Sequence, residues 1–388
     1  MTKFDMGAIA SRKTPFYYYD MALLQATIDE IKSLTAGHPV HVHYAVKANG
    51  NPDILKVFAK SGFGADCVSG GEVEAAIAAG IKPEDIGYAG VGKTDDELRL
   101  GIDKEIGYFN VESIEELVRI EELASEMGKK ARVALRVNPG IDAHTHEYIT
   151  TGLAENKFGI DMSRLDEAVD IAVNSGSLEL VGLHSHIGSQ ITITEPFALL
   201  CRKFNDIVER FRAKGVEFKV LNIGGGLGVD YEDPDANPIP DFKGYFDTVF
   251  ANIKLAPGQE LHCEFGRSLV AQFGSLIGQV IYVKQGPNKK FAIIDAGMND
   301  LLRPALYGAH HRIDVLGEDG LPLPLDGETE VYDVVGPICE SSDTFAKDEK
   351  LPVLKRGAYV ALRSAGAYGE SMASAYNMRC RNESLLNF

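Results

Sequence analysis

The sequence has few cysteines, no long apolar run and a shortage of basic residues. Its 388 residues include five cysteines, and no two form a CxxC pair, which argues against a disulfide framework and a cysteine zinc site. No apolar run reaches the roughly 18–20 residues that a membrane span needs. The N-terminal stretch MTKFDMGAIASRKTPF lacks the apolar core of a signal peptide. A cytoplasmic protein with reduced thiols, most of them in the core, is therefore expected.

Acidic residues outnumber basic ones, and the formal net charge is −17. This charge argues against general nucleic-acid binding, because phosphates would be repelled. The remaining composition, with 45% hydrophobic and 24% charged residues, is that of an ordinary globular protein. The length suffices for two domains and a large core.

Short β-branched runs alternate with stretches of helical period along the first two thirds of the chain. Several helical stretches begin with Ser, Thr or Asp and end near Gly, as capped helices do. Eight alternating strands predict a (β/α)8 barrel, with a doubly wound open sheet as the alternative. The expected strands are 41–46, 63–68, 86–90, 106–111, 132–137, 178–187, 218–223 and 260–265.

The pattern changes after about residue 268, where strand-like runs follow one another without long helices between them. This predicts a separate, mostly antiparallel β domain. The N-terminal stretch TPFYYYD (14–20) is also strand-like and is expected to join that domain. The predicted division is therefore 22–267 for the barrel, and 1–21 with 268–388 for the β domain.

Ionisable residues and glycines follow the predicted strands at their carboxyl ends, where barrels carry their active sites. Each has an ordinary structural alternative. A lysine after a strand is usually solvated, and a GGG run can be a tight turn. The pair His184 and His186 could bind metal, but no third ligand stands at a suitable spacing, so no metal is expected. The residues at these ends are Lys47, Asp66, Arg136, Asn138, His184, His186, Gly224, Gly225, Gly226, Glu264 and Arg267.

Taken together, these residues fit pyridoxal 5′-phosphate better than the structural alternatives. A lysine amine can bond to an aldehyde, and a glycine loop with Arg267 can hold a phosphate. Glu264 can keep a pyridine nitrogen protonated, and a flat imidazole such as His186 can stack on the ring. This is the set of groups that the cofactor requires.

Seven motifs also resemble those of the meso-diaminopimelate decarboxylase family, one of the alanine-racemase-like (fold type III) pyridoxal-phosphate decarboxylases. The motifs occur in order, the resemblance runs from about residue 14 to 378, and the family architecture is a barrel followed by a β domain. The motifs are YAVKAN, HSHIGSQI, NIGGGLGVDY, CEFGRSLV, RPALYGAHH, GPICESSDTFAKD and GAYGESMASAYN.

The resemblance implies a role for each matching position. Lys47 would carry the cofactor and Cys339 would be the proton donor. The cofactor contacts would be Asp66, His186, Ser189, Gly224, Gly225, Gly226, Glu264, Gly266, Arg267 and Tyr368. The substrate contacts would be Arg267, Arg303, Tyr307, Glu340 and Tyr368. The family also implies a homodimer in which Cys339 and Glu340 serve the neighbouring subunit's lysine.

Two positions depart from the family pattern. Phe265 stands where the family usually has proline, which would fix φ and remove a donor, so a reshaped loop with intact chemistry is expected. Glu370 stands where an apolar or aromatic residue is common.

The implied activity is decarboxylation of meso-2,6-diaminopimelate to L-lysine, the last step of lysine biosynthesis. Arg303 suits the distal carboxylate of this diacid and would repel an ammonium group. The alternatives are ornithine-, arginine- or carboxynorspermidine-type decarboxylases, an alanine racemase, and a non-catalytic regulatory homologue. The retained Lys47 and Cys339 argue against the last two.

Overall fold

The computed structural model describes residues 2–141, 157–379 and 382–388, and the chain forms two compact units. We call them the barrel unit and the β unit. The barrel unit comprises Ile28–Gly228 and Asp241–Gly266, and the β unit comprises Met1–Thr27, Val229–Pro240 and Arg267–Phe388. The stretch Val229–Pro240 thus lies between two barrel segments in the sequence but folds with the β unit.

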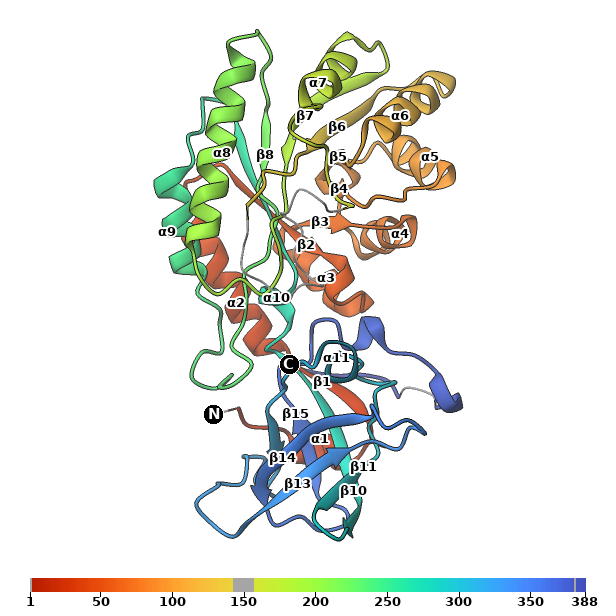
Figure 1. The fold of residues 1–388 in the computed structure, drawn as a ribbon, viewed down its shortest axis with the longest axis vertical. Helices are drawn as coiled ribbons and strands as arrows, with labels where there is room; N and C mark the ends of the chain where they lie inside the picture. The colour runs from red at the N-terminus through yellow and green to blue at the C-terminus, as the bar shows by residue number, and fades with distance from the viewer. Residues whose placement is uncertain (1, 142–156, 380–381) are drawn as a thin grey trace. The chain divides into compact units, whose positions relative to one another are not determined.

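Eight parallel strands close the barrel in sequence order, with β2 pairing both β3 and β9 (Figure 1). The predicted (β/α)8 barrel is confirmed, and the open sheet is not formed. The barrel strands are β2 (Val40–Ala45), β3 (Gly64–Cys67), β4 (Ile86–Tyr88), β5 (Tyr108–Val111), β6 (Ala131–Arg136), β7 (Leu178–His184), β8 (Val220–Asn222) and β9 (Glu260–Phe265).

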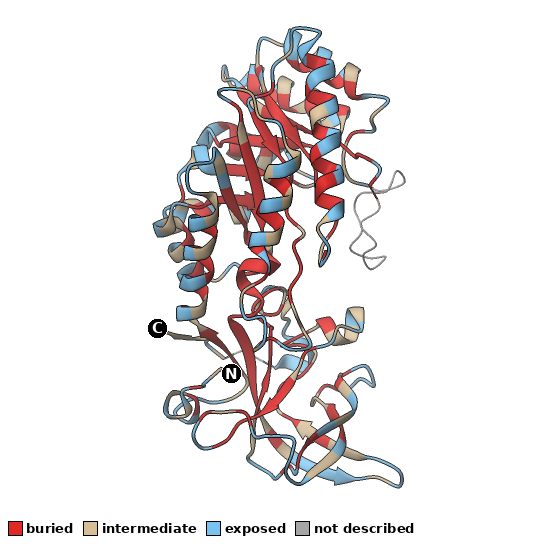
Figure 2. Ribbon diagram, turned by 90° about the vertical axis from the view of Figure 1, so that its left-hand side faces the viewer, coloured by how far each residue is buried: buried red, intermediate tan, exposed pale blue. Residues whose placement is uncertain are grey.

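Strands β3, β4, β5 and β8 are buried along their whole length, because side chains fill the barrel and helices cover it (Figure 2). One layer of the interior is packed from Tyr108, Ala134, Val181 and Val220. Every strand points its carboxyl end to the same mouth of the barrel, so side chains at these ends can act together.

The helices around the barrel begin and end at local sequence signals. Asn51, Ser69 and Ser113 each accept a backbone hydrogen bond at a helix start, and Gly62 and Gly80 end helices with left-handed φ values of 77° and 101°. These helices are α3 (Pro52–Ser61), α4 (Gly70–Ala79), α5 (Asp95–Lys104), α6 (Ile114–Glu126), α7 (Leu165–Asn174), α8 (Glu195–Arg212) and α9 (Phe242–Asn252). Helix α2 (Met21–Thr35) precedes β2.

The β unit is a sheet in the order β12-β15-β10-β11-β13-β14, mostly antiparallel, with β11 and β13 parallel. The N-terminal strand β1 pairs with β10, as predicted, and with β16. The elements are α1 (Met6–Ala10), β1 (Phe16–Asp20), α10 (Arg267–Val270), β10 (Gly274–Gln285), β11 (Lys290–Ile294), α11 (Arg303–Tyr307), β12 (Ile313–Val315), β13 (Thr329–Val335), β14 (Thr344–Pro352), β15 (Tyr359–Leu362) and β16 (Leu385–Asn387).

Among the residues described, no helix combines the length and the apolar character needed to cross a membrane.

Candidate active site

Lys47 lies one turn beyond β2, in the short 3-10 segment η1 (Val46–Ala48), at the carboxyl mouth of the barrel. Its Nζ is 3.0 Å from Oδ2 of Asp66 on β3, and the lysine side chain is 39% exposed while that of Asp66 is 1% exposed. The amine is therefore held by a buried carboxylate and still reaches the open side of the mouth. An ordinary solvated lysine would not have this partner.

The Asp66 carboxyl is fully buried, and this burial affects both its pKa and its hydrogen bonding. Burial raises the pKa of its carboxyl to about 6, the charge of Glu264 acts in the same direction, and Lys47 opposes both. Its second oxygen, Oδ1, is buried and makes no hydrogen bond within the described part of the chain. A buried acceptor without a donor is costly, and a bound group that supplies a donor would satisfy it.

Glu264 on β9 is held in the barrel interior by the side chains of His184, Asn222 and Asn110. Oε2 is 3.1 Å from Nε2 of His184, and Oε1 accepts from the side-chain amides of Asn222 at 2.7 Å and Asn110 at 3.2 Å. Burial alone raises the pKa of Glu264, but His184 and the charge of Lys47 outweigh it, so the pKa lies below its ordinary value. Glu264 is thus a buried permanent carboxylate.

The glycine run after β8 is required by close packing. A Cβ on Gly224 would lie 2.4 Å from the carbonyl of Ser185, one on Gly225 would lie 1.8 Å from the carbonyl of Glu264, and one on Gly226 would lie 2.5 Å from the carbonyl of Gly188. Gly224 and Gly226 also have φ of 67° and 112°. The three glycines therefore form a tight backbone turn that has no room for side chains of its own.

His186 lies just past the end of β7 and contacts this glycine turn. Its Nδ1 accepts a hydrogen bond from the Gly225 amide at 3.2 Å. Burial, helped by the charge of Lys47, lowers the pKa of His186 to about 3, so the ring is a neutral, flat imidazole.

The expected strand 178–187 is shorter in the structure, since β7 ends at His184 and His186 lies beyond it. His184 is committed to Glu264 and His186 to Gly225, so the two rings do not form a metal pair. His184 donates from Nε2 to the ionised Glu264, and its buried Nδ1 makes no hydrogen bond among the described residues.

The β unit carries a second cluster, built around Tyr231 from the stretch Val229–Pro240. Nη1 of Arg267 donates to the Tyr231 hydroxyl at 2.6 Å, and its guanidinium lies 5.0 Å from the centre of the Tyr368 ring. The guanidinium of Arg303 lies 4.9 Å from the centre of the Tyr231 ring. Tyr368 has a left-handed φ of 56°, a backbone strain that is typical of functional sites.

Arg303 is buried, and among the described residues no carboxylate lies within ion-pair distance of it. Its Nη1 donates to Nε2 of His311 at 2.8 Å, while His311 donates through Nδ1 to the carbonyl of Arg363 at 2.8 Å. Burial lowers the pKa of Arg303, because a charge away from water is disfavoured. A buried guanidinium held only by neutral groups is ready to pair with an incoming carboxylate.

Cys339 and Glu340 lie on the connection between β13 and β14 and are exposed. The Cys339 amide donates to Oδ1 of Asn377 at 2.9 Å, and Glu340 accepts from the Tyr376 hydroxyl at 2.6 Å. Asp343 fixes this connection by accepting from the Ile338 amide at 2.7 Å. The thiols of Cys67, Cys201 and Cys263 are free and buried, and Cys380 lies outside the described residues.

For the remaining predicted contact residues, the structure gives the position along the chain and the degree of burial. Ser189 follows β7 and is half-buried, Tyr307 ends α11 and is half-buried, and Gly266 lies between β9 and α10. Arg136 on β6 is committed to a structural pair, since its Nη1 is 2.6 Å from Oε1 of the buried Glu112.

The two departures from the family pattern have structural partners. Phe265 is fully buried and meets Phe242 and Tyr245 edge-on, with ring centres 5.2 Å apart in each case. Glu370 accepts hydrogen bonds from the hydroxyls of Tyr19 at 2.6 Å and Ser384 at 2.9 Å. The first residue therefore fills an aromatic cluster, and the second ties the chain to β1.

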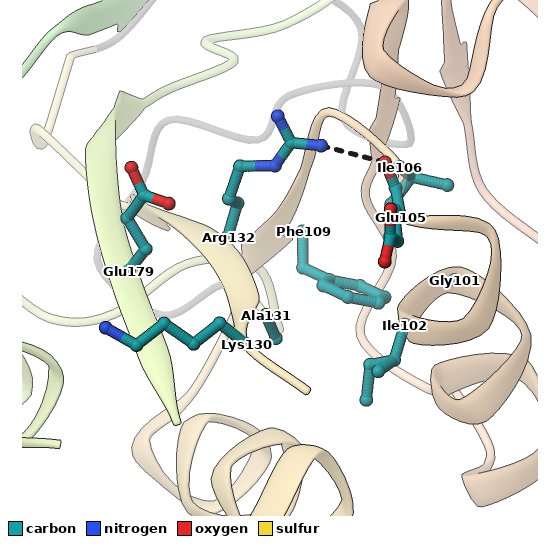
Figure 3. Close-up of a pocket in the computed structure, with 9 residues that line it drawn as sticks. All are labelled: Gly101, Ile102, Glu105, Ile106, Phe109, Lys130, Ala131, Arg132 and Glu179. Carbon is teal, nitrogen blue, oxygen red and sulfur yellow. Dashed lines mark hydrogen bonds between the residues drawn. The ribbon is translucent and has the colours of Figure 1, made fainter. Parts of the chain in front are cut away.

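A pocket of about 230 Å³ lies away from these residues, at the amino ends of β6 and β7 (Figure 3). Its charged groups are partly committed to the protein, since Nη2 of Arg132 donates to the carbonyl of Glu105 at 2.8 Å. The pocket is lined by Gly101, Ile102, Glu105, Ile106, Phe109, Lys130, Ala131, Arg132 and Glu179. None of the residues predicted to be functional lines it.

The sequence reasoning did not assign a supporting role to several side chains that hold candidate site residues, although it named His184 as a residue at a strand end. His184, Asn110 and Asn222 hold Glu264, and Tyr231 and His311 hold the two arginines. Asn222 opens the NIGGGLG motif and His311 closes RPALYGAHH, so their place in motifs was a usable signal. Tyr231 closes NIGGGLGVDY, but the motif does not show that this tyrosine folds with the β unit.

Comparison with known proteins agrees with this geometry. Residues 22–271 match the family described as pyridoxal-dependent decarboxylase, pyridoxal binding domain. A diaminopimelate decarboxylase of Bacteroides thetaiotaomicron is 51% identical over 377 residues, which cover 97% of this chain and 96% of that protein.

Two solved structures extend the comparison to three dimensions. The crystal structure of diaminopimelate decarboxylase from Helicobacter pylori complexed with L-lysine has a TM-score of 0.90 at 42% identity, covering 97% of this chain and 93% of that one. Diaminopimelate decarboxylase from M. jannaschii in co-complex with L-lysine has a TM-score of 0.89 at 37% identity, covering 99% and 89%. This chain therefore belongs to the pyridoxal-dependent decarboxylases, and within them to the diaminopimelate decarboxylase family.

Proposed function

We propose that this chain decarboxylates meso-2,6-diaminopimelate to L-lysine and CO2 with pyridoxal 5′-phosphate. The observation that carries the proposal is the pairing of Lys47 with buried Asp66 at the barrel mouth to which Glu264 presents a permanent carboxylate. Family membership and the similarity to relatives named diaminopimelate decarboxylase support it. The proposed functional division remains 22–267 for the cofactor barrel, and 1–21 with 268–388 for the β domain.

The residues at the barrel mouth fit this cofactor. Lys47 would supply the amine for its aldehyde, and the tight turn at Gly224–Gly226, which has no side chains of its own, would suit its phosphate. Buried Glu264 keeps a partner nitrogen protonated, and neutral His186 offers a face for stacking. Ser189, Gly266, Arg267 and Tyr368 are proposed as further contacts. When bound, the cofactor supplies the electron sink for the carbon that loses CO2.

Substrate choice is assigned to Arg303. Its buried guanidinium has only neutral partners among the described residues, so a substrate carboxylate would provide the missing countercharge. An ammonium group at the same place would be repelled. Diaminopimelate carries a carboxylate at its distal end, and ornithine and arginine do not. Arg267, Tyr307 and Tyr368 are proposed as further substrate contacts.

Cys339 is proposed to return the proton to the substrate carbon after CO2 leaves, and Glu340 to bind the distal ammonium group. Both side chains are exposed, and backbone or side-chain hydrogen bonds fix their connection. We infer that they act in a homodimer, where each would serve the lysine of the neighbouring subunit. The free thiols also favour a reducing, cytoplasmic setting.

The test of this proposal is product formation from meso-diaminopimelate, followed as L-lysine and CO2 release. The wild-type chain is expected to form both and to act far more slowly on L-ornithine and L-arginine. Arg303→Ala should raise KM for diaminopimelate much more than for any trace activity on those monoacids. Equal effects on both would refute the role of Arg303, and faster turnover of ornithine would favour the alternative decarboxylase.

A further inference from the structure

A group of two histidines and one glutamate lies at the amino ends of β2 and β9, the end opposite Lys47. His41 on β2 is directly opposite His262 on β9, and Glu260 lies two residues before His262, on the same face of that strand. We call His41, Glu260 and His262 the seam cluster, because β2 and β9 are the first and last strands of the barrel and their pairing closes it.

Distances within the seam cluster suit a shared small cation. Nε2 of His41 is 3.6 Å from Oε1 of Glu260, and Nε2 of His262 is 3.5 Å from Oε2. The three ligand atoms all lie within 4.8 Å of one another. Ligands of a tetrahedral zinc ion with bonds of about 2.1 Å are roughly 3.4 Å apart, so two contacts already have this spacing. The His41 and Glu260 side chains are 51% and 47% exposed, so both can adjust.

The inner nitrogen of the His262 ring is held inside the barrel. Nδ1 of His262 lies 2.9 Å from Nε2 of His43 and 2.9 Å from the Tyr108 hydroxyl. Nδ1 of His43 in turn contacts the carbonyl of Ala65 at 3.4 Å. These contacts hold the ring with Nε2 toward Glu260, and the tautomer that carries the proton on Nδ1 presents the lone pair of Nε2 to a cation.

We propose that Nε2 of His41, the Glu260 carboxylate and Nε2 of His262 coordinate a divalent transition-metal ion of the zinc class, with water completing the tetrahedron. Imidazole and carboxylate are ligands that zinc accepts, and the His43 partner orients His262 as a supporting residue orients a metal-binding histidine. The ion would clamp β2 to β9. It would be structural, since the reacting groups lie at the other mouth.

The test is zinc binding to the full-length holoenzyme after removal of adventitious metal with a chelator. Calorimetric titration with Zn²⁺ should give about one ion per chain at this site. His41→Gln and Glu260→Gln should each weaken it by at least about ten-fold. Both residues are half-exposed, so these changes leave the core intact. His310→Gln is the matched control, because His310 also faces a single carboxylate, Glu232, at 3.5 Å and should not affect binding.

Two further measurements make the outcome decisive. X-ray absorption at the zinc edge should show two imidazole ligands and oxygen near 2.0–2.1 Å, roughly the distances of zinc sites. Titration of Cys339→Ser removes the exposed thiol as a competing ligand and should leave the site occupied. Absence of binding, equal affinity in His41→Gln and wild type, or loss of the ion only in Cys339→Ser would each overturn the proposal. None of these results depends on catalysis.

Discussion

The guanidinium of Arg303 is buried and is contacted by neutral side chains. The ring of Tyr231 and the acceptor nitrogen of His311 hold it, and the tautomer of His311 is fixed by the Arg363 carbonyl. Neutral partners position a charge without neutralising it. Glu264 is likewise held by polar side chains, those of His184, Asn222 and Asn110.

His311 is therefore predicted to act as a positioning residue for Arg303. His311→Ala should raise KM for meso-diaminopimelate by about ten-fold or more, because a hydrogen bond to a charged group contributes roughly 1.5–3 kcal/mol. The effect on kcat should be smaller, and His311→Gln, whose amide oxygen can accept, should restore part of the affinity. The neighbouring His310→Gln serves as the control. An unchanged KM in His311→Ala would contradict the assignment.

Glu264 is predicted to act through its charge. Glu264→Gln keeps the shape of the side chain and removes the carboxylate, so kcat should fall by about 10²–10³-fold, as for loss of a strong electrostatic contact. The exposed Glu179→Gln, on β7 at the opposite mouth, should leave kcat unchanged (Figure 3). Steady-state kinetics on the cofactor-loaded variants measures this. A kcat within two-fold or so of wild type would show that the charge is not used.

At the level of elements, the loops after β7 and β8 are joined by hydrogen bonds. The amide of Ile191 donates to the Gly226 carbonyl at 2.9 Å, the amide of Gly228 donates to the Ile191 carbonyl at 2.9 Å, and His186 accepts from Gly225. The glycine turn is thus fixed by its neighbours before any ligand is bound, which is the condition for a preorganised phosphate site.

Gly225→Ala is predicted to disturb both stability and cofactor retention. The new methyl group would lie 1.8 Å from the Glu264 carbonyl, so the loop must move, at a cost of roughly 1–3 kcal/mol or more. Urea unfolding and the cofactor content of the purified protein measure the two effects. Gly176→Ala is the control, since a Cβ there meets nothing within 4 Å. If Gly225→Ala behaved like the control, the turn could not be as tightly packed as described.

The elements that the sequence predicts are those with strong local signals. The eight barrel strands follow from β-branched runs between capped helices, and β1 and β10 follow from their apolar runs. Strands β12 and β16 have three residues each, and β14 is rich in charged residues, so no local pattern marks them. Their formation depends on tertiary pairing, which a single sequence does not show.

The residues of the candidate site also divide into those that a local sequence signal marks and those that depend on tertiary structure. Lys47, Asp66 and Glu264 were predictable because strand ends and motifs mark them. The role of His184 was not predictable, because it depends on where β7 ends. The end of the strand determines which histidine of HSH points to Glu264. Tyr231 was not predictable, because its stretch folds with residues that follow by more than thirty positions.

At the scale of the whole molecule, buried neutral histidines make stability depend on pH. Burial lowers the pKa of His311 to about 3 from an ordinary 6.5, with the charge of Arg303 acting in the same direction. The unfolded chain therefore binds this proton below about pH 6.5 while the folded chain does not. The stability contribution is complete above pH 6.5 and is lost as the pH falls toward 3, by about 1.4 kcal/mol per pH unit.

The corresponding prediction concerns the slope of stability against pH. Between pH 7 and pH 5, the free energy of unfolding in urea should fall less steeply for His311→Gln than for wild type, because glutamine does not titrate. His310→Gln should keep the wild-type slope, since His310 is exposed. Identical slopes in wild type and His311→Gln would mean that His311 is accessible to protons in the folded chain.

The central claim is that Lys47, and no other lysine, carries the cofactor. Lys93 is a useful contrast, because its side chain is buried and is already committed to Glu116 at 2.6 Å and to two backbone carbonyls. The direct measurement is borohydride reduction of the yellow holoenzyme, followed by protease digestion and mass spectrometry. The account predicts a pyridoxyl group on the peptide that contains Lys47. A label on Lys93 or another lysine, or a colourless protein that takes up no label, would contradict it.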